Sequence, residues 1–239
     1  MVGSIVPTRA PPATDEIIRA PLFARSPAFA TPKELADWLG GIVAARAEWV
    51  GDFDDVQWSL GRAFYTHLEQ DKESLYFAEA ARSDALVERA APGLQARMCA
   101  AVATMTGEPV VARAGWCGPG VHIFPANGWL ALHGGEVHFD LEGMSDAEIK
   151  DGAPALTLVL MLQPAARGGE LGVWDIVHGA GATESAPRPP DALVAYEPGD
   201  LVAIDSRRLH QIQPFAGSVD RISATVHAVR TRGRWECWF

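Results

Sequence analysis

The side chains in this sequence best suited to chemistry are a histidine and an aspartate near the middle of the chain. His138 and Asp140 lie two positions apart in the segment GGEVHFD, residues 134–140, so on an extended backbone both side chains leave the same face. That spacing can deliver one imidazole and one carboxylate to a single metal ion. A surface strand whose polar residues face water explains the same HxD pattern, so this segment alone does not decide between the two.

A second histidine follows at the end of PGDLVAIDSRRLH, residues 198–210, where a turn, a short apolar strand and a polar loop lead to His210. Two histidines and one carboxylate on a β-scaffold form the facial triad of non-haem Fe(II) oxygenases, which leaves coordination positions open for a co-substrate and O2. His138, Asp140 and His210 are therefore the candidate metal ligands and catalytic centre.

The stretch RISATVHA, residues 221–228, alternates strictly between polar and apolar residues, with Arg221 and Ser223 on one face. An edge strand with its polar face in solvent is one interpretation. In the other, the polar face lines the interior of a barrel while helices cover the apolar face. Only then could Arg221 and Ser223 hold a carboxylate together, the guanidinium as a two-donor fork and the hydroxyl as an extra donor.

Taken in this order, these residues resemble the Fe(II)/2-oxoglutarate-dependent dioxygenase superfamily, whose pattern is HxD, a distal His, and an Arg followed two residues later by Ser. The resemblance implies that His138, Asp140 and His210 bind iron. It also implies that Arg221 and Ser223 bind the distal carboxylate of the co-substrate 2-oxoglutarate.

Two accessory features agree with this resemblance, which covers roughly residues 108–230. The sequence GGEL at 168–171 is similar to the turn and strand of prolyl-hydroxylase-like members, and residues 198–210 are similar to their usual run into the distal histidine. The resemblance implies an oxidoreductase that uses Fe(II), 2-oxoglutarate and O2, with hydroxylation as the default outcome. Asp140 stands where halogenating members have a small residue, so halogenation is disfavoured, whereas desaturation, ring closure and epimerisation stay open.

Other residues are candidates for lining the pocket. Asn127 lies where family members often place a 2-oxoglutarate contact, although a turn asparagine is the ordinary alternative. Trp129 and Trp174 are candidate substrate walls, as opposed to core tryptophans. Arg208, beside the distal histidine, is either surface charge or a contact for an anionic substrate.

Composition restricts the class of protein. Twenty basic and thirty acidic residues give a net charge of −10 without a Lys/Arg-rich block, which argues against nucleic-acid binding. The three cysteines are far apart and form no CxxC pair, so a reducing compartment, the cytoplasm, is expected. No apolar run approaches the ~20 residues of a membrane helix, so no membrane association is expected. The expected partner is a small-molecule substrate.

The sequence predicts a single domain, 1–239, that is mainly β with helical support. Residues 1–30 are expected to form a proline-rich N-terminal arm, 31–107 a helical support packed on one sheet, and 108–239 a catalytic core with the double-stranded β-helix fold, a cupin-like jelly roll. A capping box at Thr31 predicts a helix to about Trp49, and a second helical region is predicted over 83–105, divided at Pro92. The expected strands are 110–114, 119–124, 129–133, 156–162, 170–174, 193–196, 201–205 and 221–229.

Two other functions fit part of this evidence. The same scaffold could hydroxylate a residue in a peptide or protein, which needs an open groove. A cupin-like binding module without redox chemistry is the second alternative, against which the Arg221 and Ser223 pair argues. The polar segments 141–155 and 175–190 are expected to form a mobile lid over the site, which favours a small substrate.

Overall fold

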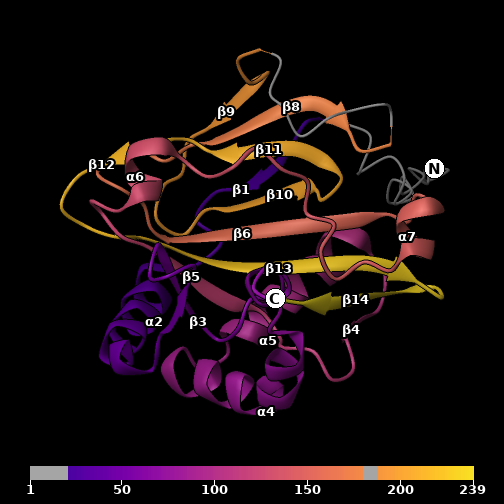
Figure 1. The fold of residues 1–239 in the computed structure, drawn as a ribbon, viewed down its shortest axis with the longest axis horizontal. Coiled ribbons are helices and arrows are strands. Elements are labelled where there is room, and N and C mark those ends of the chain that lie inside the picture. The colour runs from indigo at the N-terminus through magenta and orange to yellow at the C-terminus, as the bar shows by residue number, and fades with distance from the viewer. Residues whose placement is uncertain (1–20, 180–187) are drawn as a thin grey trace, which may run out of the picture.

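Two facing β-sheets, with helices packed outside one of them, make up the computed structural model, which describes residues 21–179 and 188–239 (Figure 1). Within the described residues, the larger sheet has nine strands in the order β1-β10-β6-β13-β5-β3-β2, with β14 beside β13 and β4 beside β14. Its strands are β1 (Ala24–Ser26), β2 (Val50–Asp52), β3 (Gln57–Leu60), β4 (Val110–Ala112), β5 (Gly120–Phe124), β6 (Ala155–Gln163), β10 (Leu201–Asp205), β13 (Arg221–Thr231) and β14 (Arg234–Trp238).

The smaller sheet has the order β11-β8-β9, and a two-stranded ribbon, β7 with β12, lies beyond it. These strands are β7 (Arg167–Gly168), β8 (Leu171–Val177), β9 (Ala192–Val194), β11 (Arg208–Ile212) and β12 (Phe215–Ala216). Leu171 and Val173 of β8 pack with Val202 and Ile204 of β10, so apolar side chains join the two sheets at this end. Two antiparallel sheets packed in this way are the layers of a jelly roll.

Three longer helices cover the outer face of the larger sheet (Figure 1). They are α2 (Pro32–Ala44), which η1 (Arg46–Glu48) follows, α4 (Glu73–Ala90) and α5 (Leu94–Thr106). Trp38 of α2 and Met98 of α5 share one core cluster with Leu158 of β6 and Val226 of β13. Since helices cover one face of β6 and the interior covers the other, its sequence ALTLVLMLQ is almost continuously apolar, with little alternation.

Three shorter helices connect the strands around the interior: α3 (Phe64–Leu68), α6 (Trp129–His133) and α7 (Asp146–Lys150). The structure therefore corrects the predicted strand at 129–133, which is helical. Its sequence WLALH is too short for periodicity to distinguish the two states, and its Leu and Ala residues are good helix formers.

The predicted helical support is also corrected, because β2 and β3 extend the larger sheet from within residues 31–107. The capping box at Thr31 is confirmed, and so is the break near Pro92, although α4 begins ten residues before the predicted start. In the predicted arm, residues 24–26 pair with β10, while residues 1–20 lie outside the described part of the chain.

Residues 141–155 form hydrogen bonds with the rest of the fold, and their expected mobility as a lid stays a prediction. Ser145 caps α7 in a reciprocal capping box with Glu148, and Glu148 pairs with Arg113 at 3.2 Å. Trp238 donates from its indole nitrogen to the Glu142 carbonyl at 3.2 Å. Of the other expected lid segment, residues 180–187 lie outside the described residues. No described helix has the length and apolar character needed to cross a bilayer.

Candidate active site

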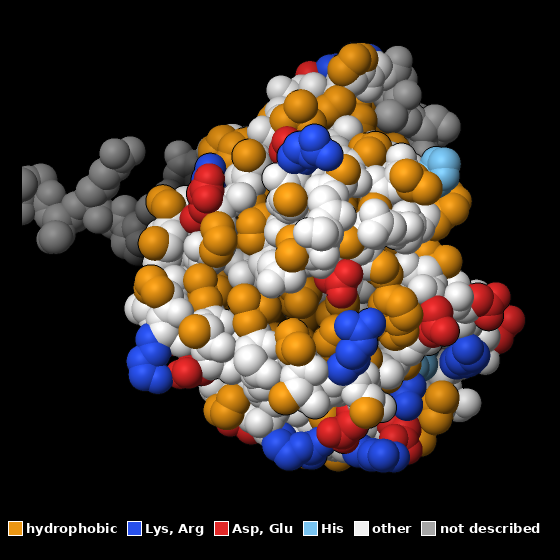
Figure 2. All heavy atoms as spheres, turned by 90° about the vertical axis from the view of Figure 1, so that its left-hand side faces the viewer, with side chains coloured by type: hydrophobic (Ala, Val, Ile, Leu, Met, Phe, Trp, Pro, Cys, Tyr) orange, Lys and Arg blue, Asp and Glu red, His pale blue; other side chains and the backbone are white. Residues whose placement is uncertain are grey.

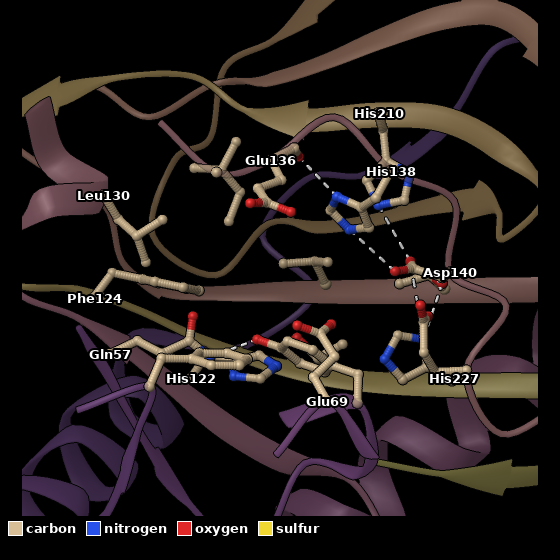
Figure 3. Close-up of a pocket in the computed structure, with 18 of the residues that line it drawn as sticks. Gln57, Glu69, His122, Phe124, Leu130, Glu136, His138, Asp140, His210 and His227 are labelled. Atoms are coloured by element: carbon tan, nitrogen blue, oxygen red, sulfur yellow. Dashed lines mark hydrogen bonds and ion pairs between the residues drawn. The ribbon is translucent and has the colours of Figure 1, made fainter. Parts of the chain in front are cut away.

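The three candidate metal ligands meet at one end of the space between the sheets (Figure 3). One ligand atom from each of His138, Asp140 and His210 lies within 4.8 Å of the other two. His138 Nε2 is 3.3 Å from Asp140 Oδ1, and His210 Nε2 is 3.2 Å from Asp140 Oδ2. Two imidazole nitrogens and a carboxylate at this separation could hold one divalent ion with part of its coordination sphere open.

Backbone pairing brings the two histidines together although they are distant in sequence. His138 and His210 form an antiparallel bridge in which each amide donates to the other residue's carbonyl at 3.0 Å. The amide of Asp140 donates to the Ser206 carbonyl at 2.8 Å. The register of β11 shifts between Arg208 and His210, and such an irregularity beside a site can redirect a side chain.

Hydrogen bonds behind each ring determine which nitrogen faces the site. Nδ1 of His138 lies 2.8 Å from the Glu136 carbonyl, and Nδ1 of His210 lies 2.8 Å from the Arg208 carbonyl. A carbonyl only accepts, so both Nδ1 atoms carry hydrogen and both Nε2 atoms face the site, where each can bind a metal ion once it carries no proton. The second oxygen of Asp140 is oriented in the same way, since Thr157 Oγ1 donates to it at 2.6 Å.

The three groups are electrostatically coupled. Burial lowers the pKa of His138, but the hydrogen bond and negative charge of Asp140 outweigh burial and raise this pKa to about 9. Burial opposes ionisation of Asp140, yet the neighbouring His210 and His138 hold its pKa well below the ordinary value. The carboxylate is therefore ionised at neutral pH and attracts a positive charge to the point between the rings.

Arg221 is a buried positive charge without an acidic partner. Its side chain belongs to a residue that is 1% exposed, and no described carboxylate lies within ion-pair distance. Its hydrogen bonds are long and go to neutral groups, from Nε to the Gly169 carbonyl at 3.4 Å and from Nη1 to Ser223 Oγ at 3.3 Å. The guanidinium lies 5.4 Å from the ring centres of Phe124 and Tyr196. An anion is the group that this environment lacks.

Tyr196 adds a further donor at this position, which sequence reasoning missed. Its hydroxyl oxygen is buried and has no hydrogen-bond partner among the described residues. Burial raises the pKa of Tyr196 to about 12, so the hydroxyl keeps its proton and can donate. Its place two residues beyond β9 offers no sequence signal, because only the packing of the small sheet brings it to Arg221.

A cavity of about 510 Å³ adjoins the metal site. Figure 2 shows a hollow with many hydrophobic side chains around it on the face that carries α6 and β12 in Figure 1. The described residues that line the cavity are Phe53, Val56, Gln57, Phe64, Tyr65, Glu69, His122, Phe124, Trp129, Leu130, Gly135, Glu136, His138, Asp140, Glu142, Thr157, Val159, His210, Ile212, Phe215, Thr225, His227, Trp238 and Phe239. A mostly apolar cavity of this size suits a small organic molecule.

Of the three predicted pocket residues Asn127, Trp129 and Trp174, only Trp129 lines the cavity. Trp129 lines the cavity and is 51% exposed. Asn127 is exposed in the turn before α6 and does not line the cavity, so its contact with the co-substrate stays a prediction. Trp174 is buried among Phe139 and Leu209 and donates to the Arg188 carbonyl, so it is a core residue and no substrate wall.

Arg208 is corrected as well, because its side chain does not reach the cavity. It is buried and pairs with Asp175 at 2.5 Å on the smaller sheet. Trp238 and Phe239, which sequence reasoning passed over, are cavity walls because β14 pairs with β13. The aromatic segment WECWF could have suggested a strand, but no local signal could place it beside the site.

The fold is similar to those of several solved structures. An N-substituted L-amino acid dioxygenase from Burkholderia ambifaria AMMD matches with a TM-score of 0.58 and 12% identity over 95% of this chain and 90% of that chain. The α-ketoglutarate-dependent epimerase SnoN from nogalamycin biosynthesis matches with a TM-score of 0.55 and 17% identity over 92% and 84%. A prolyl hydroxylase from Trichoplax adhaerens, in complex with a hypoxia inducible factor peptide fragment, matches with a TM-score of 0.51 and 12% identity over 89% and 85%.

No family model and no curated protein matches the chain. At these identities the likeness to solved structures shows the fold, and it confirms the predicted jelly roll with helices packed on one sheet.

Proposed function

We propose that this protein is an Fe(II)- and 2-oxoglutarate-dependent dioxygenase that oxidises a small organic substrate, with hydroxylation as the outcome. His138, Asp140 and His210 would hold the iron. The observation that carries the proposal is the presence, in one fold, of this open three-ligand site and of the buried Arg221 without a counter-ion. A metal site alone fits many proteins, whereas a metal site with a separate carboxylate receptor fits a chelating dicarboxylate.

The residues present fit 2-oxoglutarate. Arg221 would bind the distal carboxylate through its two-donor fork, with the Ser223 and Tyr196 hydroxyls as further donors. Bound iron would supply the activation of O2 that is coupled to oxidative decarboxylation of 2-oxoglutarate. Asp140 occupies the carboxylate position among the ligands, which leaves no vacancy for a halide and supports oxygenation over halogenation.

The size of the cavity supports a small molecule as the substrate. Mostly apolar walls line a hollow of about 510 Å³, a volume that suits a small organic ligand. The similar structures include an epimerase as well as a hydroxylase, so the fold is compatible with several outcomes of one oxidation step. The described cysteines are all free, which is compatible with the cytoplasm that we propose as the compartment.

The test is to load the protein with Fe(II) without O2, add 2-oxoglutarate and measure succinate after O2 is admitted. Succinate should form in the wild type and be absent in Asp140→Ala at equal protein concentration. If the wild type neither binds 2-oxoglutarate in the presence of Fe(II) nor forms succinate, a non-redox binding module becomes the better interpretation.

A further inference from the structure

Gln57 and Tyr65 form an uncharged polar pair in the mostly apolar wall of the cavity. Gln57 belongs to β3 and Tyr65 to α3, and both side chains line the cavity. The amide nitrogen of Gln57 donates to the hydroxyl oxygen of Tyr65 at 2.5 Å. Neither residue is a candidate metal ligand or one of the donors beside Arg221. The proposed function therefore leaves this pair without a role.

The pair keeps one donor and one acceptor for a ligand. The Tyr65 oxygen accepts from Gln57, and no described residue accepts the Tyr65 hydrogen. Burial raises the pKa of Tyr65, so the hydroxyl keeps its proton and can donate. The carbonyl oxygen of Gln57 also lacks a partner among the described residues, but it is not fully enclosed by protein. Because Gln57 lines the cavity and is only 4% exposed, a ligand in the cavity can reach this oxygen.

Packing holds both side chains in position. The ring centre of Tyr65 lies 6.3 Å from that of Phe53 and 5.7 Å from that of His122. Gln57 belongs to a strand that pairs with β2 on one side and β5 on the other. A ligand would therefore meet a donor and an acceptor that are already ordered, and such preorganisation lowers the entropic cost of binding.

Sheet register separates the pair from the carboxylate receptor at Arg221. Arg221 of β13 lies opposite Phe124 of β5, and Trp58 of β3 lies opposite Ile123 of β5. One residue further along the same antiparallel register, Gln57 is level with Phe124. The Phe124 ring centre is 5.4 Å from the Arg221 guanidinium, so this ring stands between Arg221 and Gln57 on the inner face of the sheet. The cavity wall therefore offers a second polar position beyond Phe124, distinct from the one that fits 2-oxoglutarate.

The second polar position is remote from the metal site. Figure 3 shows Gln57 close to Phe124 at one end of the cavity, whereas Asp140 lies at the other end. Phe64 and Phe239 are among the aromatic residues that line the space. A molecule held at Gln57 would therefore extend an apolar body along aromatic walls toward the metal site. Hydrogen bonds at the remote end would determine which carbon of that body faces the metal.

We propose that Tyr65 and Gln57 recognise the substrate, and that the substrate is an apolar ring compound carrying an uncharged hydroxyl group. A hydroxyl is a small neutral group that both accepts and donates, so it would accept from Tyr65 and donate to Gln57. The ring would pack on the aromatic walls of the cavity. This inference rests on the proposed function for the reaction that follows, but binding at the pair does not require iron.

Matched probes test this inference. One set is 2-indanol, 2-indanone and indane, and a second is 2-tetralol, 2-tetralone and tetralin. Within each set the alcohol accepts and donates, the ketone only accepts, and the hydrocarbon does neither. Dissociation constants are measured by tryptophan fluorescence, since Trp129 and Trp238 line the cavity. The titrations use the metal-free protein and the complex with Fe(II) and 2-oxoglutarate without O2.

Three variants identify the donor and the acceptor. Tyr65→Phe should raise the Kd of the alcohol and of the ketone about fivefold or more relative to the hydrocarbon, because the ligand oxygen loses its donor. Gln57→Leu should raise the relative Kd of the alcohol in the same way, but not that of the ketone, which needs only Tyr65. Gln95→Leu is the matched control, since Gln95 is also hydrogen-bonded but does not line the cavity. It should bind every probe as the wild type does, and thermal unfolding checks that each variant is folded.

The inference is overturned if neither alcohol binds at millimolar concentration, or if Tyr65→Phe leaves the ratio of alcohol Kd to hydrocarbon Kd unchanged. A pair that only tied α3 to β3 would change the unfolding temperature on substitution and leave that ratio as it is. These failures are distinct from failure of the proposed function. Loss of alcohol binding in the variants, without any 2-oxoglutarate turnover by the wild type, would refute the dioxygenase and leave the hydroxyl receptor in place. Turnover of 2-oxoglutarate with no effect of either variant on the probes would refute only the receptor.

Discussion

Replacing Arg221 with methionine should move stability and ligand binding in opposite directions. The wild-type guanidinium is buried without a carboxylate partner, which is unfavourable in the protein without ligand. Methionine fills similar space without a charge. Replacement of buried ionic groups by apolar side chains is often neutral or stabilising by about 1–4 kcal/mol, so the free energy of unfolding of the metal-free variant should stay level or rise.

Binding of 2-oxoglutarate should weaken strongly in the same variant. Loss of one partner of a buried, hydrogen-bonded charge pair costs about 2–5 kcal/mol, which corresponds to a Kd about 30-fold to about 4000-fold higher. Arg221→Lys keeps the charge but loses the two-donor fork, so its Kd should fall between the wild type and the methionine variant. Iron affinity should change little, because Arg221 is not among the three ligands.

Arg208→Met is the matched control, since Arg208 is equally buried but already paired with Asp175. It should leave the Kd for 2-oxoglutarate unchanged. Calorimetry with Fe(II) and without O2 gives the dissociation constants, and thermal denaturation of the metal-free proteins gives stability. The reasoning is refuted if Arg221→Met binds 2-oxoglutarate like the wild type and unfolds with a loss of more than about 2 kcal/mol, since Arg221 would then be a structural residue.

Three further outcomes are expected. Asp140→Ala should abolish tight Fe(II) binding while far-ultraviolet circular dichroism stays unchanged; retention of stoichiometric iron would contradict the ligand assignment. Thr157→Val removes the donor 2.6 Å from Asp140 Oδ2 and should lower iron affinity about 10- to 100-fold in a chelator competition. Burial raises the pKa of Asp52 from 3.8 to about 6, so the folded state retains a proton that the unfolded state loses, and stability should fall by roughly 3 kcal/mol as pH rises through this interval. Asp52→Asn should flatten that part of the profile in urea unfolding at pH 4 and pH 7, and an unchanged slope would exclude Asp52 as its source.

Residue spacing predicted the parts of the site that depend on one strand. Two-residue periodicity specifies which side chains share a face whatever the topology, and Arg221 and Ser223 are indeed buried on one face of β13. Periodicity does not specify whether that face of the strand lies against solvent, the core or a ligand cavity. The resemblance places Trp174, just past GGEL, near the cavity mouth, yet its apolar ring packs in the core with Phe139 and Leu209.

The sequence predicted elements that depend on residues close together in the chain. It missed strands that form only by pairing with strands distant in sequence. The capping box at Thr31 depends on residues three apart, and the helix that it predicted is present. β3 pairs with β5, and β14 pairs with β13. The position of each short strand in the sheet therefore depends on a partner strand and cannot be predicted from its own residues. Short strands of this kind depend on tertiary context, which propensity does not contain.

The backbone bridge between His138 and His210 has a consequence for the folding pathway. These residues are far apart in sequence, so their pairing closes a long loop and belongs to the slow, non-local part of folding. A nascent or partly unfolded chain would therefore lack the complete ligand set and could not hold iron tightly. Iron acquisition would then report that both sheets have assembled, and a redox-active ion would reach the ligands only when the surrounding walls are in place to contain its reaction.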